Sequence, residues 1–163
     1  MKMIALTRGY VSIVDDQDFE RVSAHKWRAL VCPRNDGSAL VYAVRDVLRD
    51  GGGWTAQYMH NMISGTPYGM CTDHIDGNGL NNTRENLRIC TNAENLRNRR
   101  AQMVGTSAYK GVDWRKCRRK WRAQIQAYGV KHHLGDFDTE IAAARAYDAA
   151  AMKLHGEFAR LNL

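Results

Sequence analysis

The stretch TDHIDGNGLNN, residues 72–82, decides how the middle of this chain folds. It places an acid directly before a histidine, Asp73 before His74, and continues almost entirely with residues that favour turns. Glycine and asparagine readily adopt positive φ or form local side-chain turns, so the residues after His74 are predicted to form a structured loop. Such a loop either reverses the chain or holds a reactive pair in place.

The segments after this loop predict a second strand and then a helix. NLRIC, residues 86–90, is predicted to form a brief strand, and TNAENLRNRRAQ, residues 91–102, a helix. Thr91 is a candidate N-cap, and Glu94 follows three residues later, which is the spacing of a capping box. The predicted order is therefore strand, loop, strand and helix.

This layout brings together a carboxylate, an imidazole and two amides. They belong to Asp73, His74, Asn86 and Asn95. Carboxylate and amide oxygens suit a hard cation such as Mg²⁺, and histidine is the usual general base near neutral pH. A metal beside a base indicates phosphodiester hydrolysis, in which the metal stabilises charge on the phosphate and the leaving oxygen.

The positive charge of the chain is concentrated in one segment. The formal net charge is +7, and thirteen Lys or Arg residues but three acids lie between Arg84 and Lys131. The rest of the chain has eleven Lys or Arg residues and fourteen acids. A concentrated basic region favours a polyanionic partner over an ordinary solvated surface.

The chain divides into three predicted regions of an α+β fold. Residues 1–56 are predicted to be β-rich, with strands at GYVSIV and ALVYAVRDVL. Residues 57–102 begin with a short helix at QYMHNMIS and contain the DH loop. After a linker at 103–108, residues 109–163 are predicted to form three strands and one helix. The core is predicted to contain the four tryptophans, Trp27, Trp54, Trp114 and Trp121.

Other features limit the class of protein. No apolar run is long enough to span a membrane, and no secretory signal is visible at the start of the chain. The four cysteines are widely spaced without a CxxC pair, so neither a structural zinc nor a secreted disulfide framework is expected. These observations favour a cytoplasmic protein, and we expect a monomer without an obligate protein partner.

The spacing of DH, Asn86 and Asn95, together with the phrases DHIDGN, ENLR and TNAEN, resembles the HNH nuclease motif over about residues 57–100. It is most similar to the phage and intron-borne homing endonucleases, whose module is the ββα-metal fold, and this similarity implies a bacterial or phage-infected host cell. The resemblance implies that Asp73 and Asn95 bind one divalent metal, Mg²⁺ or alternatively Mn²⁺. It further implies that His74 activates water and that Asn86 orients the imidazole of His74. His60 falls where this branch often carries a histidine, either as a structural residue or as a phosphate contact.

The segments YKGVDWR, KWRAQI, HLGDFDT and AAARAYDAAA resemble the plant ethylene-response-factor (APETALA-type) DNA-binding domain over residues 109–163. That resemblance implies a three-stranded antiparallel sheet on one helix, with the sheet in the major groove. Asp113, Cys117, Gln124 and Gln126 depart from the plant pattern, which commonly has Arg, Trp, Glu and Arg there. The plant target sequence is therefore not expected to apply.

Strand alternation then separates the residues that face DNA from those that face the helix. The predicted contacts on the sheet face are Arg115, Gln124, Gln126, Lys131 and His133. The predicted contacts near the first turn are Lys116, Arg118, Arg119 and Lys120. Arg97, Arg99 and Arg100, after the last predicted metal ligand, are further predicted contacts.

The sequence therefore predicts a site-specific endonuclease of the homing type that nicks or cuts double-stranded DNA. Two alternatives stay open. A DNA-binding regulator would keep residues 109–163 but would not need Asp73, His74 and Asn95 together. An RNA-binding protein would share the basic charge.

Overall fold

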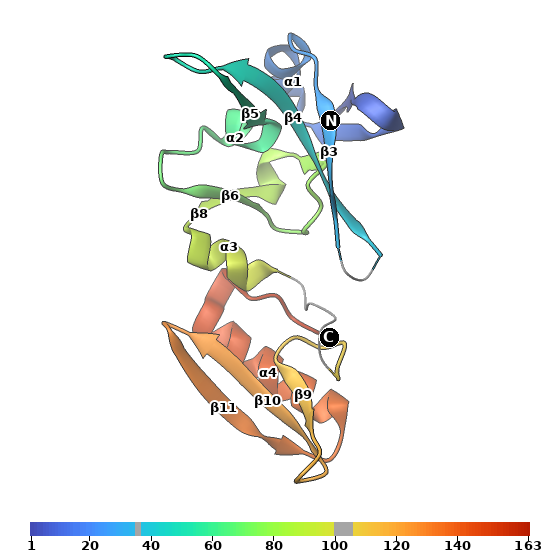
Figure 1. Ribbon diagram of the computed structural model, residues 1–163, viewed down its shortest axis with the longest axis vertical. Helices are drawn as coiled ribbons and strands as arrows, with labels where there is room; N and C mark the ends of the chain where they lie inside the picture. The colour runs from blue at the N-terminus through green and yellow to red at the C-terminus, as the bar shows by residue number, and fades with distance from the viewer. Residues whose placement is uncertain (35–36, 100–105) are drawn as a thin grey trace. The chain divides into compact units, whose positions relative to one another are not determined.

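The computed structural model describes residues 1–34, 37–99 and 106–163. The chain forms two compact units, Met1–Asn95 and Leu96–Leu163 (Figure 1). Each unit combines β-strands with at least one helix, so the predicted α+β class is confirmed.

The described residues of the first unit form three small sheets, in the strand orders β1-β2-β7, β3-β4-β5 and β6-β8. Its helices are short, and α3 continues past the end of the unit. The elements are β1 (Lys2–Ala5), β2 (Val11–Val14), α1 (Asp16–Ser23), β3 (Arg28–Pro33), β4 (Ala39–Leu48), β5 (Trp54–Tyr58), α2 (Met59–Ser64), β6 (Cys71–His74), β7 (Asn81–Asn82), β8 (Leu87–Cys90) and α3 (Asn92–Asn98).

The N-terminal segment pairs directly with the loop that follows His74. Strand β2 runs parallel to β7, with Ile13 opposite Asn81 and Val14 opposite Asn82. The N-terminal segment and helix α2 also share one core, because Met59 and Ile63 of α2 pack with residues of the N-terminal strands and helix. The core residues are Ile4, Leu6, Val14, Val22, Trp27, Ala29, Ala43, Met59 and Ile63. The core therefore crosses the predicted boundary between residues 56 and 57.

Two expectations for this unit need correction. The helix predicted over 57–64 begins at Met59, because β5 pairs with β4 up to Tyr58 and leaves less chain for the helix. Trp54 was predicted to lie in the core but is 70% exposed, at the end of the β4–β5 ladder opposite Leu48. Trp27 is buried, as predicted.

Among its described residues, the second unit contains a three-stranded antiparallel sheet with a long helix packed on one face. Its elements are β9 (Val112–Arg115), β10 (Lys120–Ala127), β11 (Val130–Phe137) and α4 (Glu140–His155). The strand order is β11-β10-β9, and Figure 1 shows α4 running across the sheet. The predicted three strands and helix are all present.

One sheet face and small residues of α4 form the core of this unit. Val112 and Ala123 pack with Ala143 and Ala144, and Ile125 packs with Tyr147 and Ala151. The alanine run of α4 therefore lets the helix lie close to the sheet. The Thr139 hydroxyl accepts a hydrogen bond from the Ala142 N–H and caps the helix, as predicted. Within the described residues, no helix is long and apolar enough to cross a membrane.

Candidate functional site

A two-stranded hairpin positions the predicted catalytic pair. Strand β6 ends at His74 and pairs with β8, so that Asp73 lies opposite Arg88 and His74 opposite Leu87. Both Asp73 and His74 are buried, with exposed fractions of 6% and 5%. The pair is therefore held by strand backbone on one side and by the following loop on the other.

An amide from that loop orients the imidazole of His74. The Nε2 atom of His74 lies 3.1 Å from Oδ1 of Asn82, which is fully buried. The Nδ2 group of Asn82 donates to the Ser12 hydroxyl at 2.8 Å, which fixes the amide with its oxygen towards His74. Because an amide oxygen only accepts, the bond places the proton of neutral His74 on Nε2 and the lone pair on Nδ1.

The surroundings of His74 keep its imidazole neutral. Burial lowers the pKa of His74 below its ordinary value, and this effect exceeds the opposing effects of the Asn82 hydrogen bond and the Asp76 and Asp73 charges. A neutral imidazole at physiological pH can accept a proton, as a general base must.

His60 packs against His74 within a cluster of rings. The two imidazoles meet edge to face, with centroids 4.9 Å apart and an interplanar angle of 88°. Tyr42 and Tyr58 also contact His60, which is 7% exposed and whose Nδ1 has no hydrogen-bond partner among the described residues. Burial and the neighbouring His74 lower the pKa of His60 to about 3. This burial favours the structural interpretation of His60 over a phosphate contact.

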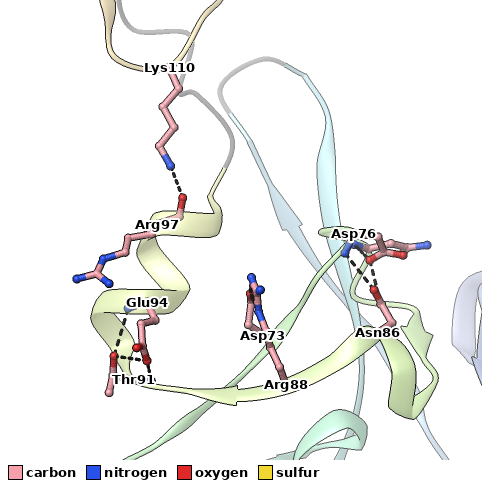
Figure 2. Close-up of polar contacts among 9 residues, drawn as sticks. Asp73, Asp76, Asn86, Arg88, Thr91, Glu94, Arg97 and Lys110 are labelled. Carbon is pink, nitrogen blue, oxygen red and sulfur yellow. Dashed lines mark hydrogen bonds and ion pairs between the residues drawn. The ribbon is translucent and has the colours of Figure 1, made fainter. Parts of the chain in front are cut away.

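Asp73, the first predicted metal ligand, forms an ion pair with Arg88. Oδ2 of Asp73 accepts from Nη2 of Arg88 at 2.7 Å and from Nε at 3.0 Å (Figure 2). Only 7% of the Asp73 side chain and 12% of the Arg88 side chain are exposed. A cation that binds Asp73 would therefore share this carboxylate with a guanidinium.

Asn86 ties the loop to the second strand. Its Nδ2 donates to Oδ1 of Asp76 and to the Asn81 carbonyl, while its Oδ1 accepts from the Asp76 N–H (Figure 2). Partial burial raises the pKa of Asp76, but hydrogen bonds from Asn78, Asn81 and Asn86 outweigh it, so the pKa is lowered. Asn86 thus closes the loop around Asp76. Its proposed contact with the imidazole of His74 stays a prediction.

Asn95, the second predicted metal ligand, lies half-buried in the first turn of α3. The predicted capping box is present: the Thr91 N–H and hydroxyl both donate to Glu94, and the Thr91 hydroxyl accepts from the Glu94 N–H (Figure 2). The structure therefore fixes the start of the helix that carries Asn95. Among the described residues, no group of three or more His, Cys, Asp and Glu side chains could hold a metal. The predicted donor set, Asp73 and Asn95, would supply one carboxylate and one amide oxygen, a combination that fits a hard cation that keeps its waters.

The sheet of the second unit presents a polar face opposite α4. Across β10 and β11, Gln124 lies opposite His133 and Gln126 opposite Lys131, so these four side chains share one face. Gln126, Lys131 and His133 are exposed, and Gln124 and Arg115 are half-buried. The predicted separation of the two sheet faces therefore agrees with the burial of these residues.

The predicted contacts near the first turn have acidic neighbours. Arg118 lies 2.6 Å from Asp136, and Lys120 lies 2.9 Å from Asp138. Arg119 occupies the turn itself, with φ of 51°, and is exposed like Lys116. The turn therefore carries both cations that are paired with aspartates and exposed cations, Lys116 and Arg119.

Of the three arginines after Asn95, two are described. Arg97 places its guanidinium 5.5 Å from the ring centre of Tyr128, and Arg99 is exposed. The prediction for Arg100 lies outside the described residues.

Two sets of contacts were not predicted from the sequence. The first joins Asn82 to His74 and Ser12, and the second is the ion pair between Asp113 and Arg122 on the sheet. Asn82 was interpreted as loop structure, and no local pattern connects it to Ser12, which lies seventy residues earlier in the chain. Arg122 could have been found, because strict alternation from Gln124 places it on the same face.

Comparisons with known proteins agree with both predicted resemblances. The HNH endonuclease family model matches residues 62–97, and the AP2 domain model matches residues 107–157. The chain is 39% identical over 96 residues to protein 3.8 of Escherichia phage T7, which covers 59% of the chain and 78% of that protein.

Two further relatives each match part of the chain. An uncharacterised HNH endonuclease of Acanthamoeba polyphaga mimivirus is 38% identical over 96 residues, covering 59% of the chain and 49% of that protein. The rice APETALA2-like protein 2 is 48% identical over 60 residues, covering 36% of the chain and 14% of that protein. No solved structure matches the chain.

The chain thus combines an HNH endonuclease domain with an AP2-type domain, and both domains indicate DNA binding. It belongs to the same family as protein 3.8 of phage T7.

Proposed function

We propose that this protein is a site-specific endonuclease of the homing type that hydrolyses phosphodiester bonds in double-stranded DNA. The observation that carries the proposal is the state of His74. It is a buried, neutral imidazole held by Asn82 beside Asp73, within the segment that matches the HNH endonuclease family. A regulator that only binds DNA would have no use for a buried base fixed in this way.

In this proposal His74 acts as the general base. Its Nε2 proton is held by Asn82, so Nδ1 would take the proton from the attacking water. The oxygen of that water would then bond to phosphorus as the bond to the leaving oxygen breaks. Asn82 would also stabilise the imidazolium that forms, because its Oδ1 keeps accepting from Nε2.

Asp73 and Asn95 would hold one divalent cation, and Mg²⁺ is the proposed ion with Mn²⁺ as the alternative. When bound, the cation supplies stabilisation of charge on the phosphate and the leaving oxygen. Arg88 lowers the negative charge available at Asp73, since the two form a buried ion pair. Affinity for the cation without DNA is therefore expected to be weak.

The second unit would select the DNA site. Its polar sheet face carries arginine and glutamine, which can bond guanine and adenine through paired hydrogen bonds. The cations of the β9–β10 turn would meet phosphates and anchor the protein on any sequence. One proposed active site per chain favours nicking, unless the chain dimerises or cuts the strands in succession.

The direct test is incubation of supercoiled plasmid DNA with the protein in Mg²⁺, in Mn²⁺ and in EDTA. The proposal expects nicked or linear product with either metal and none with EDTA. Circular dichroism and the melting temperature should stay the same in EDTA, because a cation held by only two protein ligands is expected to bind weakly without DNA and to add little to stability. DNA binding without cutting under all three conditions would favour the regulator instead.

A further inference from the structure

We propose that Arg122 reads a guanine and that Asp113 is the positioning residue that orients it, which makes this pair a determinant of sequence specificity. The inference rests on the proposed function, in which the outer sheet face meets DNA. It concerns two residues that were not among the predicted DNA contacts, and it follows from how their side chains bond to one another.

The pair lies on the polar sheet face and joins the edge strand β9 to the central strand β10. Asp113 of β9 and Arg122 of β10 are direct cross-strand partners. Nε of Arg122 donates to Oδ1 of Asp113, and Nη2 donates to Oδ2, each at 2.9 Å. Two parallel hydrogen bonds fix the plane of the guanidinium as well as its position.

This bonding uses one edge of the guanidinium and leaves another for a ligand. Asp113 engages the side edge, formed by Nε and Nη2. The end edge, formed by Nη1 and the second N–H of Nη2, keeps two parallel donors. Guanine presents two acceptors, O6 and N7, in the major groove, and paired donors of arginine match them.

The charge of the pair argues against an anchoring role. Arg122 is already neutralised by Asp113, and the carboxylate would repel a nearby phosphate. The nearby turn has cations better suited to phosphates, such as Lys116 and Arg119, whose side chains are exposed. By comparison, 25% of the Arg122 side chain is exposed, so it loses little conformational freedom on binding.

Gln124 extends the same arrangement along β10. Its Nε2 lies 3.4 Å from Oδ1 of Asp113, so Asp113 contacts the side chains of two successive outward positions on one strand. Because glutamine commonly pairs with adenine, the neighbouring base pair is the expected target of Gln124. The Asp113 carboxylate would thus set the orientation of both readers.

The test uses the full chain in EDTA, so that no strand is cut, and a random DNA duplex library. Bound sequences are compared for the wild type, Arg122→Ala, Asp113→Asn and Gln126→Ala. Arg118→Ala is the matched control, because it also removes an arginine paired to an aspartate of the same sheet. Circular dichroism and melting temperature verify that each variant is folded.

Arg122→Ala is expected to lower guanine preference at one position by roughly 5- to 150-fold and leave other positions unchanged. Asp113→Asn should weaken preference at that same position, without lowering affinity for a scrambled duplex, since it removes a negative charge. Replacing that guanine by 7-deazaguanine should weaken the wild type but not Arg122→Ala. Arg118→Ala should weaken all duplexes evenly.

Three results would overturn parts of this account, and each is distinct. If Arg122→Ala lowers the affinity for all duplexes equally, Arg122 contacts phosphate and not a base. An unchanged guanine preference in folded Asp113→Asn would remove the positioning role of Asp113. If Arg122→Ala and Gln126→Ala both bind with wild-type preferences, the sheet does not read DNA, and the proposed role of the second unit fails as well.

Discussion

At the scale of single residues, the chain from Ser12 through Asn82 to His74 links the proposed base to the N-terminal segment. Ser12 and Asn82 are both fully buried. The Ser12 hydroxyl also donates to the Leu80 carbonyl at 3.0 Å, so the chain fastens the loop as well as the imidazole. Removing one member of such a buried network leaves its partners without hydrogen bonds, which is energetically costly.

Asn82→Ala is therefore expected to slow cleavage by about 10²-fold, because a misplaced catalytic group can cost that much. The DNA affinity should stay near that of the wild type. Single-turnover cleavage measures the rate, and the control is Asn78→Ala, an exposed asparagine of the same loop. If both variants cut at the wild-type rate, Asn82 has no part in positioning His74.

The buried His60 predicts a specific dependence of stability on pH. Its pKa is lowered to about 3 in the folded chain, whereas an unfolded chain has a histidine pKa of about 6.5. The unfolded state therefore binds more protons between these values, and the free energy of unfolding falls as the pH drops below about 6.5.

His60→Phe keeps a ring in this cluster but removes the titrating group, so the loss of stability on acidification should become smaller. Urea unfolding at pH 7.5 and pH 5 measures the effect for the variant and the wild type. The same decrease in both proteins would show that His60 is not the source of the acid sensitivity.

At the scale of elements, the close packing of β9, β10 and α4 depends on one glycine. Gly111 has φ of 75°, and a Cβ atom there would lie 2.2 Å from Tyr147 of α4 and 2.4 Å from the Gln124 carbonyl. Gly129, in the β10–β11 turn, has φ of 78° but no atom within 4 Å of such a Cβ. The two positions share backbone strain and differ in available space.

Gly111→Ala is accordingly expected to unfold the second unit, or to lower its melting temperature much further than Gly129→Ala. The latter should lose roughly 1 kcal/mol from backbone strain alone. Thermal unfolding followed by circular dichroism makes the comparison. Equal melting temperatures for the two variants would mean that α4 can move away from the sheet at little cost.

Local signals in the sequence predict helices and their caps better than they predict which strands pair. The capping box of α3 and the cap of α4 follow from a few adjacent residues, and both are confirmed. The parallel pairing of β2 with β7 is not visible locally, because it joins residues 13 and 81 through one two-residue strand. Asn82 could not be assigned to His74 for the same reason, since its orientation depends on that pairing.

At the scale of the whole molecule, the chain separates two kinds of chemistry into two units. The first unit holds a buried imidazole, the proposed base, beside a paired carboxylate, and the second holds a polar sheet face on a closely packed helix. The HNH and AP2 matches fall on these different parts of the chain. Cutting and binding should therefore be separable by mutation.

The central claim is tested most directly by comparing cleavage and binding in His74→Ala. The wild type, His74→Ala and the control His25→Ala are titrated on DNA in EDTA and then assayed for cutting in Mg²⁺. We expect His74→Ala to bind like the wild type and cut about 10²- to 10⁴-fold more slowly, with His25→Ala unaffected in both assays. Cutting by folded His74→Ala at the wild-type rate would contradict the account.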